Sequence, residues 1–107
     1  MATFSEFTDY LHLEKKYSPH TVTAYQKDLE SFWKFASENY EYTSLEKVHY
    51  SVIRSWIVSL VDAGISNRSI NRKISSLKTY YKFLLKIERI TENPLAKHKS
   101  LKVSKKI

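Results

Sequence analysis

The chain is poor in the two residues that shape tight turns. Among 107 residues there is one glycine, Gly64, and there are two prolines, Pro19 and Pro94. An all-β fold needs many tight turns, which depend on glycine and proline, so the sequence favours an all-α fold. Hydrophobic residues make up 42% of the chain and aromatic residues 14%, which is enough for one core in a single compact domain.

Apolar residues at spacings of three and four predict four helices. The first is expected from about residue 3 to residue 17, and the second from Pro19 to about Glu38, with Ser18 as its cap. Gly64 is expected to end the third helix, and Ser66 to cap the fourth. The expected core stripes are Phe4, Phe7, Tyr10 and Leu11; Val22, Tyr25, Leu29, Phe32, Trp33 and Ala36; Ile53, Trp56, Ile57, Leu60 and Val61; and Ile70, Ile74, Leu77, Tyr81 and Leu84.

Two segments lack a clean helical period. Residues 39–50 are expected to form a long connection. After a turn at Asn93-Pro94, the lysine-rich residues 95–107 have little to bury. The expected organisation is therefore one folded domain over residues 1–94, followed by a basic linker over residues 95–107.

The charge of the chain is strongly polarised. Residues 1–62 contain six lysines and arginines against nine acidic residues, a net charge of −3. Residues 63–107 contain twelve lysines and arginines against two acidic residues, a net charge of +10. The net charge of the whole chain is +7. Such asymmetry favours a polyanionic partner, either a nucleic acid or an anionic membrane face.

The face of the fourth predicted helix opposite its apolar stripe carries no acidic residue. Arginines and lysines on such a face can neutralise phosphates, and small hydroxyls can approach closely and donate hydrogen bonds. The alternative is a solvated helix face, although such faces usually mix both signs of charge. The residues of this face are Arg68, Arg72, Ser75, Thr79 and Lys86, flanked by Ser69, Ser76 and Lys82.

The start of the second predicted helix is another candidate anion site. Ser18, His20 and Thr21 surround the unpaired backbone N–H groups of its first turn, at the positive end of the helix dipole, and Lys15 and Lys16 precede them. The alternative is that the serine and proline form only a structural cap, because this pair is common at the start of a helix. The two interpretations stay open.

No catalytic or metal-binding pattern is present in the sequence. There is no cysteine, the four histidines include no pair four residues apart, and there is neither a nucleophile elbow nor a glycine-rich loop. We expect no metal, no cofactor and no enzymatic activity within this chain. Without a signal peptide or a long apolar run, a cytoplasmic protein with no membrane partner is expected.

Several segments in order resemble a known family. They are Phe4, Phe7, Tyr10 and Leu11; Ser18-Pro19-His20-Thr21 with Tyr25, Asp28-Leu29 and Phe32; and residues 64–84 leading to Asn93-Pro94. This pattern is similar to the N-terminal core-binding domain of tyrosine recombinases of the phage-integrase and Xer type. The resemblance implies a compact four-helix SAM-like bundle that forms half of a clamp around duplex DNA, with its second and fourth helices facing the DNA.

The resemblance also implies site residues and partners. Expected partners are double-stranded DNA at a recombination site, a C-terminal catalytic domain of the same protein and other recombinase protomers in a tetramer, with the isolated domain a monomer. The family's catalytic Arg, Lys, His and Tyr residues have no counterpart here, and Glu88 stands where the family often has glycine after the fourth helix. Together with the positive charge of Lys16, the implied DNA-binding residues are Ser18, His20, Thr21, Lys27, Asn67, Arg68, Ser69, Arg72, Ser75, Ser76 and Thr79.

A different class of function remains as an alternative. The tyrosines Tyr40, Tyr42 and Tyr50 fall in the connection between the second and third helices, where they could form an exposed apolar strip. In this interpretation the chain is a helical protein-interaction module that mediates assembly of an oligomer.

Overall fold

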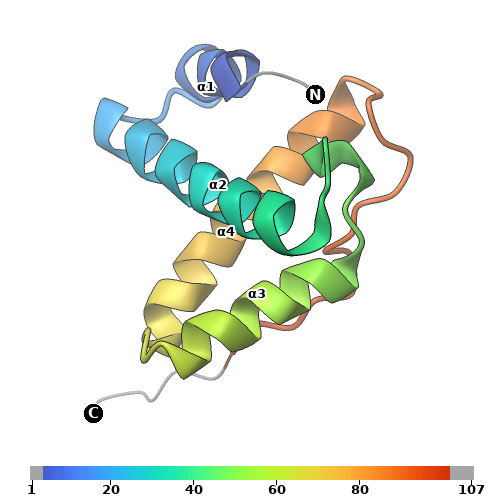
Figure 1. Ribbon diagram of the computed structural model, residues 1–107. Coiled ribbons are helices and arrows are strands. Elements are labelled where there is room, and N and C mark those ends of the chain that lie inside the picture. Colours follow the sequence, from blue (N-terminus) through green and yellow to red (C-terminus); the bar gives the residue numbers. More distant parts are fainter. Residues whose placement is uncertain (1–3, 102–107) are drawn as a thin grey trace.

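A computed structural model describes residues 4–101 of the chain. In this range it contains four α-helices, one short 3-10 helix and no strand, which confirms the all-α prediction. The longest two helices, α2 (Pro19–Tyr40) and α4 (Asn67–Lys86), cross near the centre of the molecule (Figure 1). The shorter α1 (Phe4–Leu13) and α3 (Tyr50–Asp62) pack against both of them.

The helix starts follow the capping residues expected from the sequence. The Ser18 side chain accepts a hydrogen bond from the Thr21 backbone N–H at 3.3 Å, and Pro19 occupies the first turn of α2. The Ser66 side chain accepts one from the Ser69 backbone N–H at 3.2 Å, so α4 begins at the next residue. Each serine satisfies one of the N–H groups that a first helical turn leaves unpaired.

The helix ends use the left-handed backbone conformation, and only one of them has glycine. Gly64, with φ +82°, follows α3 as expected. Lys16 (φ 53°) lies in the turn after α1, which ends at Leu13, four residues earlier than predicted. Glu41 (φ 56°) ends α2, and Glu88 (φ 60°) follows α4. Glu88 therefore adopts the conformation that a glycine would adopt at lower cost, and α4 ends at Lys86.

The core lies between the four helices. All five stripe residues of α4 are buried, as expected, and Tyr80 and Phe83 are buried as well. Trp56 is buried against Phe32, with ring centroids 5.1 Å apart, and Trp33 is partly buried against the core, so both tryptophans have packing roles. The prediction was wrong for Val61, which is 49% exposed because it lies in the last turn of α3 beyond its partners.

The predicted connection over residues 39–50 contains structure of its own. A 3-10 helix, η1 (Leu45–Lys47), is capped by Ser44, and Leu45 is completely buried. The carbonyl oxygen of Leu45 accepts a hydrogen bond from the Tyr81 hydroxyl at 2.8 Å. The start of α3 at Tyr50 also shortens the connection relative to the prediction.

The described part of the C-terminal tail, residues 95–101, folds back along the domain (Figure 1). Leu95 is buried, so the expectation that this segment has little to bury was wrong there. The Asn71 side chain donates to the Leu101 carbonyl and accepts from the Leu101 N–H, both at 2.9 Å. These contacts return the chain from the far end of α4 to its N-terminal part.

Residues 102–107 of the expected linker lie outside the described residues. No helix in the described range is long and apolar enough to cross a membrane.

Candidate nucleic-acid interface

A buried carboxylate lies at the crossing of α2 and α4. Asp28, on α2, has a side chain only 4% exposed, and three side chains of α4 surround it. Arg72 donates to it through both terminal nitrogens, at 2.9 and 3.4 Å. Lys73 Nζ is 3.4 Å from Oδ1, and the Ser76 hydroxyl donates to Oδ2 at 2.7 Å. Asp28 therefore has the paired, hydrogen-bonded surroundings that a buried charge requires.

This cluster changes the expected role of two predicted DNA-binding residues. Ser76 is completely buried, so the prediction that it contacts DNA was wrong; its hydroxyl serves Asp28. Arg72 is bound to Asp28, but its side chain remains 49% exposed. The sequence of α4 contains no acidic residue, but Asp28 of α2 lies against this face.

Sequence reasoning missed Asp28 because only the acidic residues of α4 itself were considered. One signal was present: Asp28 lies three residues after Tyr25 and four before Phe32, on the apolar stripe of α2. A single acidic residue on an otherwise apolar helix stripe indicates a buried partner of opposite charge.

The remaining predicted residues of α4 are more accessible. Asn67, Arg68 and Ser75 are exposed, whereas Ser69 and Thr79 are half-buried. The Thr79 hydroxyl donates to the Ser75 carbonyl at 3.0 Å, which directs it toward its own helix. Arg68 and Arg72, four residues apart, are the accessible guanidinium groups of the N-terminal half of α4.

The start of α2 presents a mixture of structural and accessible groups. Ser18 and Thr21 share a hydrogen bond between their hydroxyls at 3.0 Å, in addition to the backbone cap. Ser18 therefore caps α2 as expected, and its contact with DNA stays a prediction. Lys16, His20 and Lys27 are exposed. In Figure 1 the N-terminal halves of α2 and α4 both lie to the left of the crossing. His20 and Lys27 belong to the first of these halves and Arg68 to the second, while Lys16 lies in the turn before α2.

Comparison with known proteins identifies the fold. Residues 4–88 match the family model of the phage integrase N-terminal SAM-like domain. The chain belongs to this family. The match begins at the first residue of α1 and ends just after α4, so it covers all four helices of the SAM-like domain.

Three curated relatives are tyrosine recombinases named XerC. The chain is 40% identical over 94 residues to that of Anoxybacillus flavithermus, 43% over 88 residues to that of Listeria innocua, and 36% over 94 residues to that of Lacticaseibacillus casei. These alignments cover 88%, 82% and 88% of this chain but 31%, 29% and 32% of the relatives. The chain thus spans about a third of the length of the relatives it matches. No solved structure matches it.

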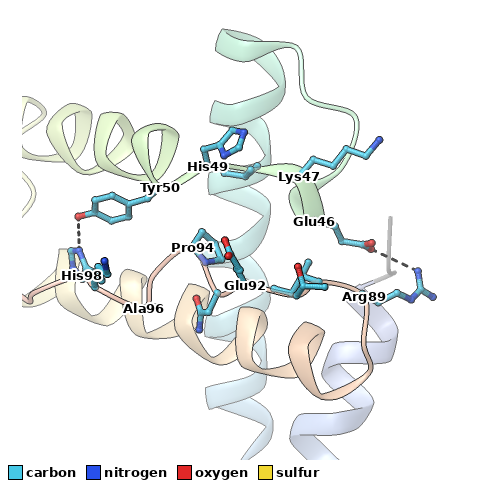
Figure 2. A pocket seen from close by; sticks show the side chains of 14 residues that line it. Glu46, Lys47, His49, Tyr50, Arg89, Glu92, Pro94, Ala96 and His98 are labelled. Atoms are coloured by element: carbon cyan, nitrogen blue, oxygen red, sulfur yellow. Dashed lines mark hydrogen bonds and ion pairs between the residues drawn. The ribbon is translucent and has the colours of Figure 1, made fainter.

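A cavity of about 940 Å³ in the SAM-like domain lies apart from the predicted DNA-binding residues (Figure 2). Its walls are residues 46–50 on one side and residues 89–94 and 96–98 on the other. Two contacts connect these walls: Glu46 lies 3.8 Å from Arg89, and the Tyr50 hydroxyl is 2.9 Å from His98 Nδ1. Burial lowers the pKa of His98. Within residues 4–101 no group of three or more histidine or acidic side chains could hold a metal.

The tyrosines of the alternative interaction strip have separate environments in the SAM-like domain. Tyr40 is exposed and donates to the Ser55 hydroxyl at 2.9 Å. Tyr42 is partly buried against the core, and Tyr50 bonds to His98. The three residues therefore contribute to the fold individually, and their role in an oligomer stays a prediction.

Proposed function

We propose that this SAM-like domain binds duplex DNA through the N-terminal halves of α2 and α4. The observation that carries the proposal is the exposure of Arg68 and Arg72 on a helix that contains no acidic residue. Arginine side chains on one face can neutralise successive phosphates and release counterions from the duplex. Lys16, just before α2, and His20 and Lys27, in its N-terminal half, add exposed positive or hydrogen-bonding groups.

The domain is proposed to act within a site-specific tyrosine recombinase, as the names of its relatives suggest. Its part is to hold DNA at a recombination site, while a separate catalytic domain of the same protein cuts through a 3′-phosphotyrosyl link. Other protomers of the recombinase would complete a tetramer on the DNA. Size-exclusion chromatography of the isolated domain without DNA tests whether this domain assembles by itself. A monomer would mean that the tetramer depends on other parts of the protein or on the DNA.

DNA binding is tested by a salt titration of the isolated domain with a duplex. The affinity is expected to fall steeply with salt, and Arg68→Ala and Arg72→Ala should each weaken binding and flatten the salt slope by about one unit. The matched control is Arg54→Ala, because Arg54 is also exposed but belongs to α3. Salt-insensitive binding, wild-type affinity in both α4 variants, or an equal loss in the control would contradict the proposal.

A further inference from the structure

We propose that Asp28 is a positioning residue for DNA binding: it holds the Arg72 guanidinium in one orientation, ready to meet a backbone phosphate. This inference rests on the proposed DNA-binding function. It assigns a role to an acidic residue buried beneath a surface whose expected ligand is itself negatively charged.

The contact between the two side chains fixes an orientation as well as a distance. Both terminal nitrogens of Arg72 face the Asp28 carboxylate, one at 2.9 Å from Oδ2 and the other at 3.4 Å from Oδ1. A planar guanidinium held by two nitrogens cannot rotate about its long axis without losing one of these contacts. Arginine has five N–H donors, and with 49% of the Arg72 side chain exposed, donors remain for a phosphate.

Asp28 is itself held in place. The Ser76 hydroxyl at 2.7 Å and Lys73 Nζ at 3.4 Å occupy further positions around the carboxylate. Arg72, Lys73 and Ser76 all belong to one turn of α4, whereas Asp28 belongs to α2. The orientation of Arg72 is therefore set by the crossing of the two longest helices, and helices position a side chain more precisely than loops do.

Two physical effects of Asp28 on DNA binding have opposite signs. Its negative charge repels a phosphate, so removal of that charge alone should strengthen binding. Its hold on Arg72 removes beforehand part of the side-chain entropy that binding would otherwise cost, so loss of that hold should weaken binding. The sign of the change in affinity therefore distinguishes positioning from charge repulsion, and its dependence on Arg72 distinguishes positioning from a merely structural role.

The first test is Asp28→Asn, which removes the charge and keeps the size of the side chain. Its affinity for a duplex is expected to be about threefold to tenfold weaker than wild type, despite the added net positive charge. In an Arg72→Ala background the same substitution should produce no further loss, because there is no guanidinium left to orient. The matched control is Glu38→Gln, which removes the same charge from an exposed position near the end of α2; it should bind no more weakly than wild type.

A second variant keeps the inference testable if Asp28→Asn does not fold. Arg72→Lys retains the charge at an exposed position but cannot form the two-nitrogen contact. We expect it to bind about threefold more weakly with an unchanged salt slope. Equal or tighter binding by Asp28→Asn, or wild-type affinity of Arg72→Lys, overturns the positioning role while DNA binding stands. Failure of the wild-type domain to bind DNA in a salt-dependent manner overturns the proposed function instead.

Discussion

The two halves of α4 are built from different interactions. In the N-terminal half a serine caps the helix, and a buried carboxylate from α2 binds Arg72, Lys73 and Ser76. In the C-terminal half the contacts are aromatic: the Phe7 ring from α1 lies 5.2 Å from the Tyr80 ring and 5.6 Å from the Phe83 ring, measured between centroids.

The two halves of α4 are therefore expected to contribute differently to DNA binding and to stability. Hydrogen-bonded charges fix directions, which suits a surface that must present cations to a ligand. Aromatic packing contributes mainly through the apolar area removed from water and is less directional. We therefore expect substitutions in the C-terminal half to change the free energy of unfolding, and substitutions in the N-terminal half to change the affinity for DNA.

The largest effect is expected from Phe7→Ala. Removal of this completely buried α1 ring, which packs against the C-terminal half of α4, should lower the free energy of unfolding by about 3–5 kcal/mol, as measured by urea denaturation. At a temperature where the variant is folded, its affinity for DNA should equal that of wild type. If Phe7→Ala leaves too little folded protein, Phe7→Leu provides a milder version of the same test. A parallel loss of affinity in the folded variant would show that the two halves are not independent.

Tyr80→Phe should have a smaller effect of the opposite sign. The Tyr80 hydroxyl is buried and has no hydrogen-bond partner among the described residues, and burial raises the pKa of its phenol. Removal of this oxygen should raise the free energy of unfolding by about 1 kcal/mol. Tyr81→Phe is the control, because the Tyr81 hydroxyl donates to Leu45 and its removal should destabilise the domain. Thermal denaturation should show a higher midpoint temperature for Tyr80→Phe and a lower one for Tyr81→Phe. Shifts of both midpoints in the same direction would argue against this difference between the two hydroxyls.

The smallest effect concerns the end of α4. Glu88 has a φ of 60°, and the next residue, Arg89, donates its backbone N–H to the Leu84 carbonyl at 2.9 Å. Glu88→Gly should raise the free energy of unfolding by roughly 0.5–1 kcal/mol, because glycine adopts this conformation without a steric penalty. Glu88→Ala removes the same charge but keeps the Cβ atom. A gain in the alanine variant as large as in the glycine variant would assign the effect to charge instead of backbone strain.

The sequence was sufficient to predict features that depend on near neighbours along the chain. The stripe from Ile70 to Leu84 is buried because a helix places residues three and four apart on one side. Ser18 and Ser66 cap their helices because a cap needs only the following turn. The all-α class and the family followed from such local patterns in their order along the chain.

Features that depend on how the helices cross could not be predicted. Asp28 and Arg72 are 44 residues apart, and nothing in the spacing of either helix states that their side chains meet. The burial of Ser76 follows from the same crossing. The contact between Asn71 and Leu101, which are 30 residues apart in sequence, likewise requires the tail to fold back. From its composition alone, the tail was predicted to be a linker.

The two hydrogen bonds between Asn71 and Leu101 also determine how a mechanical load would enter the domain. Because Leu101 is attached to Asn71, tension on the residues that follow Leu101 would be transmitted to Asn71 and not to the end of α4. Asn71 adjoins Arg72, so the load would arrive in the helical turn that we propose contacts DNA. A pull along the chain would therefore act first on the two hydrogen bonds of Asn71 and on the helical turn proposed to contact DNA, before it reached residues 95–100 and the aromatic core.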